Sequence, residues 1–406
     1  MYTIHRLSNG LRVVCLPQKG VHVCYCGLVI NVGSRDEEEG EYGVAHFVEH
    51  TVFKGTSHRS ANQILNRLDS VGGELNAYTT KEDTAVHASF LPCHLERAME
   101  LIADMVFNSS FPEKEIEREK EVIMDEISSY EDSPSDIILD NFESKAFKGT
   151  ALGHNILGTT ETVGRFGAED ARRFCMRTHS TDQMALAVWG DVDERRVMHY
   201  AEKYFGVERD IKGRGERQTV STFGKFEEQV ARDTHQTHVL MGWKAPSAHD
   251  DMRISAAVVS NLLGGPAMNS RLNVALREKN GIAYNIETSY SAFDDIGLQT
   301  IYFGTDSKNT ERSLRIVARE IDKIAQKAMT ERSLNAVLKQ YEGQILMSAD
   351  SGESVMLSAA RSALLYDASP TVEEICEQVR EGVTAASIME AAQMLGEESR
   401  SMLIYT

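Results

Sequence analysis

Two histidines and a glutamate stand within five residues of one another, in the string His46-Phe47-Val48-Glu49-His50. On a helix that turns by about 100° per residue, His46 and His50 lie about 40° apart on one face. Two imidazoles one turn apart can hold a zinc ion, and a carboxylate beside them can take a proton from water activated by the metal. The string reverses the common H-E-x-x-H order of zinc peptidases. The alternative is an ordinary amphipathic helix that happens to carry two histidines.

A metal held by two histidines needs a third protein ligand, and the segment 112–130 offers two candidates. Its helical periodicity places three isoleucines on one buried face. Glu119 and Glu126 fall at the edge of this apolar sector, where an ionised carboxylate is unfavourable unless a cation meets it. The alternative is a pair of carboxylates at the rim of an acidic helix. Together with the two histidines, these glutamates favour a metal site.

The elements that must position these residues are a mixture of helices and strands. The first half reads as strands over 3–17 (broken at 8–10), 21–32, 74–90 (around a turn at 81–83) and 183–189, and as helices over 43–54, 60–71, 95–106, 112–130 and 192–205. The second half repeats this order, with strands over 236–243, 281–290 and 296–304 and helices over 251–263, 270–279, 307–327 and 330–348. The repeat predicts two similar halves of the α+β class.

The length of 406 residues is typical of two to three domains. Residues 206–228 are polar, charged and glycine-bearing, as linkers are. We therefore expect an N-terminal metal-binding domain over 1–208, a linker over 209–226 and a C-terminal domain over 227–406.

The composition narrows the class of protein further. Lys and Arg number 43 and Asp and Glu 61, so the formal net charge is −18, which disfavours nucleic acid as a partner. No apolar run is long enough to span a membrane, and the first residues lack the pattern of a signal peptide. The six cysteines offer no C-x2-C pair and are expected to be reduced. We expect a cytoplasmic protein.

The sequence resembles the M16 (pitrilysin, or inverzincin) family of zinc metallopeptidases. Within that family it is similar to the branch of small two-domain bacterial members that are related to the mitochondrial processing peptidase. The resemblance covers nearly the whole chain, and its core is the His46-x-x-Glu49-His50 string followed 76 residues after His50 by Glu126. It implies one zinc ion per chain held by His46, His50 and Glu126, with Glu49 as general base. It further implies a duplicated LuxS/MPP-like metallohydrolase fold whose two halves close like a clamshell.

Three further pieces match the family. Glu119 matches a second acidic residue that supports the site, and we expect it to orient a ligand. The segment Asn76-Ala77-Tyr78-Thr79 resembles the strand beside the metal, whose edge can add a substrate peptide as an extra strand; the alternative is an ordinary hairpin strand. Arg277 and Tyr284 match a pair in the second half that reaches the substrate carbonyl.

The resemblance implies a zinc endopeptidase that hydrolyses peptides or unfolded protein segments. Members with two domains act as dimers, so we expect a homodimer, with a heterodimer with a related chain as the alternative. Another class of function is a non-catalytic peptide-binding or assembly subunit, but such subunits usually lack one or more of the five site residues that this chain retains. A third class is a zinc hydrolase with a small non-peptide substrate. The edge strand beside the metal disfavours this class, because such an edge suits an extended peptide.

Overall fold

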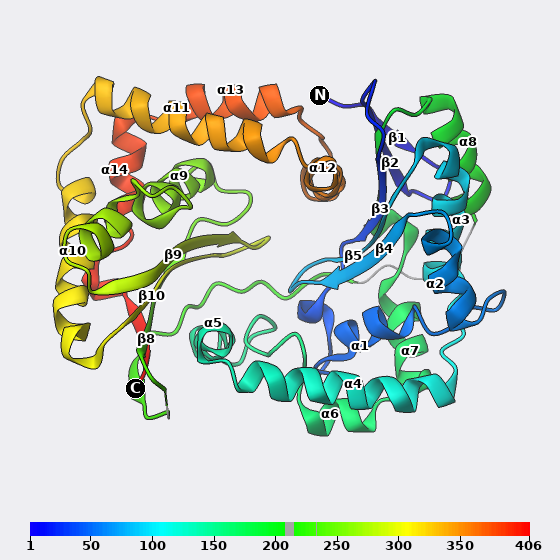
Figure 1. Ribbon diagram of the computed structural model, residues 1–406, viewed down its shortest axis with the longest axis horizontal. Coiled ribbons are helices and arrows are strands. Elements are labelled where there is room, and N and C mark those ends of the chain that lie inside the picture. Colours follow the sequence, from blue (N-terminus) through cyan, green and yellow to red (C-terminus); the bar gives the residue numbers. More distant parts are fainter. Residues whose placement is uncertain (208–214, 233) are drawn as a thin grey trace. The chain divides into compact units, whose positions relative to one another are not determined.

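The computed structural model describes residues 1–207, 215–232 and 234–406, and the chain divides into two compact units (Figure 1). Each unit has one β-sheet with apolar side chains packed on both faces. Unit 1 comprises Met1–Ser129, His154–Gln218 and Ser348–Val372, and unit 2 comprises Tyr130–Gly153, Thr219–Met347 and Glu373–Thr406. The fold is therefore of the α+β class with two domains, as the sequence predicts.

These units differ from the linear division at 208 and 226 because each takes a segment from the other half of the chain. The main passage from unit 1 to unit 2 falls at Gln218, within the expected linker 209–226. Residues 209–214 of that linker lie outside the described residues. The two exchanged segments are Ser348–Val372 in unit 1 and Tyr130–Gly153 in unit 2. A division by position along the chain cannot anticipate them, because each segment goes to the sheet whose apolar face it covers.

The sheet of unit 1 has the strand order β1-β2-β6-β3-β5-β4, in which only the β2–β6 pair is parallel. Its strands are β1 (Ile4–Arg6), β2 (Arg12–Pro17), β3 (Cys24–Ile30), β4 (Glu74–Thr79), β5 (Thr84–Phe90) and β6 (Met184–Gly190). One face is covered by a core that includes residues of α1 (Val44–Thr51), α2 (Ala61–Asp69), α3 (Leu95–Asn108), α4 (Glu113–Glu131), α6 (Thr160–Arg165), α7 (Ala168–Thr178) and α8 (Glu194–Phe205). β4 lies at the sheet edge and pairs only with β5.

The other face of this sheet is covered by α12 (Gly352–Tyr366), which comes from the second half of the chain. Alternate strand residues such as Val14 and Val29 form one apolar cluster with Met356 and three alanines of the helix. In Figure 1, α12 lies on the side of the sheet opposite α2, α3 and α8. The apolar residues that β2, β3 and β6 present to both faces therefore require this exchanged helix.

The close approach of α12 to the sheet depends on Gly352, and this predicts an effect on stability. A Cβ atom at this position would lie 2.5 Å from ring carbons of Trp189. Gly352→Ala should lower the free energy of unfolding by about 1–3 kcal/mol, as overpacking does. Gly343→Ala is the matched control, because a Cβ there meets nothing within 4 Å inside α11 (Glu331–Ser348). It should stabilise the protein by about 0.5–1 kcal/mol. Urea unfolding of both variants checks this, and a stabilising Gly352→Ala would contradict the packing.

The sheet of unit 2 has the order β7-β11-β8-β10-β9 and is likewise packed on both faces. Its strands are β7 (Glu227–Val230), β8 (Thr237–Ala245), β9 (Ala283–Ala292), β10 (Gly297–Thr305) and β11 (Ser401–Tyr405). Alternate residues of β8 join two different cores: Val239 and Met241 pack with α9 (Arg253–Gly264), α10 (Thr310–Ala325) and α14 (Ala385–Gln393), whereas Leu240 packs with α5 (Pro134–Ala146). The remaining helices are α11 and α13 (Val372–Gly382).

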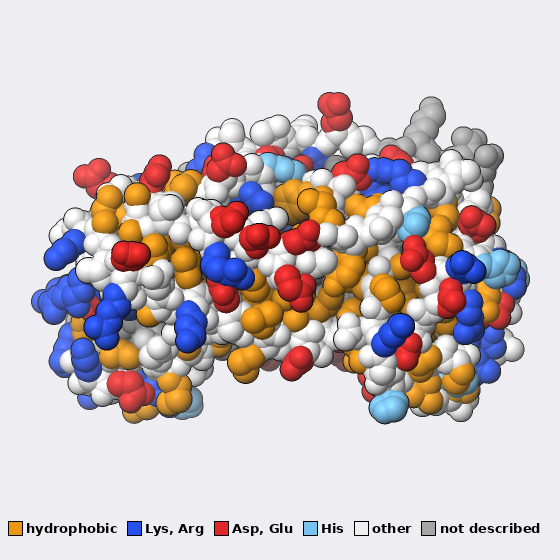
Figure 2. All heavy atoms as spheres, turned by 90° about the horizontal axis from the view of Figure 1, so that it is seen from above, with side chains coloured by type: hydrophobic (Ala, Val, Ile, Leu, Met, Phe, Trp, Pro, Cys, Tyr) orange, Lys and Arg blue, Asp and Glu red, His pale blue; other side chains and the backbone are white. Residues whose placement is uncertain are grey.

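The expected elements are confirmed in their main positions, although the segment expected as a helix over 270–279 contains a π-helix at Asn273–Glu278. Among the described residues, no helix is both long and apolar enough to cross a membrane. The face shown in Figure 2 carries acidic and basic side chains interspersed among apolar ones.

Candidate metal centre

Helix α1 carries the first three residues of the site, and its packing decides which way they point. Val44, Phe47 and Val48 are buried in the core of unit 1 and fix the helix against the sheet and α7. His46 is 7% exposed, and His50 lies one turn further on, with the ring centroids 4.5 Å apart. The two imidazoles therefore meet on one face of α1, as the spacing predicts.

Helix α4 supplies the carboxylates. Ile116, Ile123 and Ile127 are buried in the same core, which turns the helix so that Glu119 and Glu126 face α1. Glu119 is itself buried, whereas Glu126 is partly open to solvent. The helical periodicity of the sequence thus placed both carboxylates correctly at the edge of the apolar face.

The three expected ligands converge on one point. His46, His50 and Glu126 each offer one ligand atom within 4.8 Å of the others, and among the described residues they are the only group of three or more His, Cys, Asp or Glu side chains that could hold a metal ion. The Oε2 atom of Glu126 lies 3.8 Å from Nε2 of His46 and 3.4 Å from Nε2 of His50. A tetrahedral zinc ion with bonds of about 2.0–2.2 Å separates its ligand atoms by about 3.3–3.6 Å. Both distances from Glu126 are close to this separation, so the residue types and their placement fit a zinc ion.

The second nitrogen of His50 is held by a network that fixes the ring. Its Nδ1 lies 2.9 Å from Oε1 of Glu119, and the other oxygen of Glu119 lies 2.6 Å from Nζ of Lys54. In the neutral imidazole the Nδ1 proton is donated to this carboxylate, and Nε2 then presents its lone pair toward Glu126. Lys54 was not anticipated from the sequence; it lies in the turn just after α1, which ends at Thr51.

The protonation states differ between the two histidines. Burial alone would lower the pKa of His50, but the hydrogen bond to Glu119 and the nearby carboxyl groups of Glu49 and Glu126 outweigh it and raise that pKa, so a metal ion must compete with a proton there. Burial, with His50 adding to it, lowers the pKa of His46 to about 3, so this imidazole is neutral and its Nε2 or Nδ1 is free to coordinate. The Nδ1 atom of His46 is buried and has no hydrogen-bond partner. Burial alone would raise the pKa of Glu119, but hydrogen bonds from His50 and Lys54 outweigh it and lower that pKa. Glu119 is therefore ionised.

Glu49 stands beside the three ligands without joining them. Burial raises the pKa of its carboxyl, and Glu126 adds to this, while the Thr79 side chain and His50 act in the opposite direction. A carboxyl group with a raised pKa next to a metal site is suited to accepting a proton and releasing it again.

Strand β4 is an exposed edge that packs against α1. Ala77 packs on the α1 side of the sheet, and Thr79 is close enough to Glu49 to influence its pKa. Tyr78 points to the opposite face, where its ring packs under the guanidinium of Arg361 in α12. By the same alternation Asn76 faces away from α1. Tyr78 and Asn76 can therefore contribute only backbone groups beside the metal centre.

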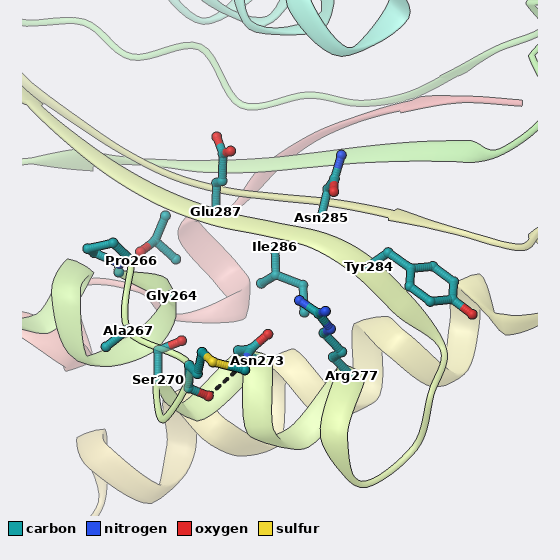
Figure 3. A pocket seen from close by; sticks show the side chains of 13 residues that line it. Gly264, Pro266, Ala267, Ser270, Asn273, Arg277, Tyr284, Asn285, Ile286 and Glu287 are labelled. Carbon is teal, nitrogen blue, oxygen red and sulfur yellow. Dashed lines mark hydrogen bonds between the residues drawn. The ribbon is translucent and has the colours of Figure 1, made fainter.

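Arg277 and Tyr284 lie together in unit 2, where they line a pocket of about 460 Å³ (Figure 3). The pocket lies between the turn Gly264–Met268, the π-helix that carries Arg277, and the start of β9, which carries Tyr284. Both side chains are exposed, and Nε of Arg277 lies 3.9 Å from Oε1 of Glu278. Arg277 and Tyr284 thus line the same pocket. Their approach to the metal centre stays a prediction.

Comparison with known proteins identifies the family. Residues 12–160 match the family model "Insulinase (Peptidase family M16)", and residues 165–341 match "Peptidase M16 inactive domain". The chain is 32% identical to the "Uncharacterized zinc protease YmxG" of Bacillus subtilis, over 92% of this chain and 90% of that protein. It is 30% identical to an uncharacterized zinc protease of Rickettsia bellii, over 99% and 97% of the two chains.

Solved structures show the same fold. A protease from Helicobacter pylori superimposes with a TM-score of 0.90 at 20% identity, covering 100% of this chain and 99% of the other. A structure from Pseudomonas fluorescens described as a peptidase M16 inactive domain gives a TM-score of 0.91 at 14% identity, covering 100% and 97%. The site residues predicted from the sequence all fall within the matched segments. The chain therefore belongs to peptidase family M16.

Proposed function

We propose that this protein is a zinc-dependent endopeptidase that hydrolyses peptides or unfolded protein segments, with one zinc ion per chain. The observation that supports this most is the convergence of three ligand atoms from His46, His50 and Glu126 beside the carboxyl group of Glu49. Bound zinc would supply Lewis acidity, which polarises a carbonyl group and lowers the pKa of water. The complete set of site residues speaks against the non-catalytic subunit, even though the second half matches an inactive-domain model.

The residues of the chain divide the remaining work. Glu49 accepts the proton of the attacking water and returns it to the leaving nitrogen. Glu119 accepts a hydrogen bond from Nδ1 of His50, and the ammonium group of Lys54 forms an ion pair with Glu119. The free edge of β4 pairs with the backbone of an extended substrate, which selects for flexible chains rather than for one side chain. Arg277 and Tyr284 donate hydrogen bonds to the substrate carbonyl as negative charge develops on it.

The assembly and location that we propose are those implied by the family resemblance. We propose a cytoplasmic homodimer, with a heterodimer with a related chain as the alternative, and we propose no role for nucleic acid or membrane. Light scattering of the purified protein distinguishes a dimer from a single chain.

The proposed activity is tested by incubating the full-length protein with a mixed peptide library and reading the products by mass spectrometry. We expect new internal cleavages that a chelator abolishes and added zinc restores. A protein that binds zinc and retains peptides without cutting them would instead be the non-catalytic binding subunit. Cleavage that is insensitive to the chelator would contradict a zinc mechanism.

Glu119→Gln should weaken zinc affinity by about 10–100-fold, as the loss of a partner behind a ligand usually does. The amide can no longer accept from both His50 Nδ1 and Lys54 Nζ, so the ring of His50 loses its fixed orientation. Competition with a chromophoric chelator measures the affinity. Glu121→Gln on the exposed side of the same helix is the matched control and should leave affinity unchanged. Equal zinc affinities of the Glu119 and Glu121 variants would mean that Glu119 is an ordinary carboxylate at the rim of the helix and does not support the metal site.

A further inference from the structure

The metal-binding helix α1 begins without a capping side chain of its own. Its first flanking residue is Gly43, with φ of +98° and no side chain to accept the free N–H groups of the first turn. A carboxylate from outside the helix takes this place. Oε2 of Glu37 accepts from the N–H of Gly43 at 2.9 Å, and Oε1 accepts from the N–H of Ala45 at 2.8 Å. The side chain of Glu37 is completely buried, and the N–H groups it accepts from belong to residues that directly precede His46.

Glu37 is in turn held by His154. Nε2 of His154 lies 3.0 Å from Oε2 of Glu37 and 2.8 Å from the backbone oxygen of Ser34. A carbonyl oxygen can only accept, so this nitrogen carries the proton and donates to both oxygens. The ring of Tyr42 stacks on His154 with centroids 4.2 Å apart. His154 therefore has one tautomer and one orientation.

The same residues connect α1 to strand β4. The backbone oxygen of His154 accepts from Nζ of Lys81 at 2.5 Å, and Lys81 lies in the turn that directly follows β4. The N–H of Ser34 donates to the backbone oxygen of Thr80 in that turn. The segment after His154 closes on the helix start, because a Cβ at Gly43 would lie 2.8 Å from the Cα of Gly158. One buried cluster thus fixes both the start of the metal-binding helix and the end of the edge strand.

From these contacts we propose that Glu37 and His154 are positioning residues, which set the orientation of α1 relative to β4 and thereby place His46 and Glu49. The inference rests on the proposed function, since it concerns the same zinc site. Burial raises the pKa of the Glu37 carboxyl, while the contacts with His154 and with the N–H groups of Ala45 and Gly43 act in the opposite direction. Neither residue touches the ligand atoms, so each acts on the metal only through the backbone of α1.

The test measures zinc affinity of the metal-free full-length protein by chelator competition, together with its melting temperature and the visible spectrum of bound Co²⁺. Glu37→Gln keeps the shape of the side chain but leaves one N–H of the first turn facing an amide group. His154→Leu removes the donor to Glu37 and Ser34. We expect both variants to weaken zinc affinity by about 10–100-fold and to alter the Co²⁺ spectrum. His154→Gln can place an N–H near the position of Nε2 and should recover most of the affinity.

Met356→Ala is the matched control for a loss of stability alone. Met356 belongs to α12 and is fully buried against the sheet of unit 1, on the face opposite α1. This variant should lower the melting temperature at least as much as Glu37→Gln, with unchanged zinc affinity and Co²⁺ spectrum. Unchanged affinity in Glu37→Gln, or an equal loss in Met356→Ala, would overturn the positioning role. A wild-type protein that fails to bind zinc would instead overturn the proposed function itself.

Discussion

Glu49→Gln is expected to retain about one zinc ion per chain while peptide hydrolysis falls by about 10²–10⁴-fold, the usual contribution of a general base. The ligand atoms belong to His46, His50 and Glu126, so replacing Glu49 removes none of them. A glutamine has nearly the same volume, but its amide does not take up a proton at neutral pH. The change therefore removes the proton acceptor and little else.

Two measurements on the same sample separate the possible results. Elemental analysis after gel filtration gives the zinc content, and cleavage of a peptide chosen from the library gives the rate. Loss of zinc together with activity would show that Glu49 supports the ligands rather than the chemistry. A rate within a few fold of the wild type would exclude Glu49 as the general base.

The placement of the candidate ligands could be predicted from the sequence because it depends on local geometry. The four-residue spacing of His46 and His50 fixes them on one face of a helix of any orientation. Glu119 and Glu126 were identifiable because charged residues at the edge of an apolar helix face are unfavourable without a cation. In both cases a single helix carried the information, and the two helices then met because each buries its apolar face in one core.

The supporting residues could not be predicted because their contacts join distant segments. Glu37 and His154 are 117 residues apart in the sequence, and no spacing rule links them. The covering of one sheet by α12 has the same origin, since the helix is separated from β6 by more than 150 residues. Strand alternation would have shown that Asn76 and Tyr78 face away from Ala77 and Thr79, but which pair faces the metal depends on where α1 packs.

Removal of a ligand should abolish metal binding, and His46→Ala tests this without measuring activity. A metal ion that binds only the folded state stabilises that state by about 2.7 kcal/mol when its concentration is 100 times its dissociation constant. The wild-type protein should therefore melt at a higher temperature when zinc is added to the metal-free form. His46 is buried and neutral, with a pKa of about 3, so its imidazole is ready to bind without releasing a proton. With two ligands left, the zinc-dependent shift in His46→Ala should disappear.

The matched control for this experiment is His58→Ala, which removes a histidine of the same unit that lies outside the ligand cluster. His58 contacts Asp104 at 2.6 Å and is largely exposed, so its loss should cost some stability but leave the zinc-dependent shift intact. The comparison uses the shift between metal-free and zinc-loaded samples of each variant, which cancels differences in starting stability. A full shift in His46→Ala would place the zinc site elsewhere in the chain. Loss of the shift in His58→Ala as well would mean that zinc stabilises the fold through the wider histidine content rather than through the centre between α1 and α4.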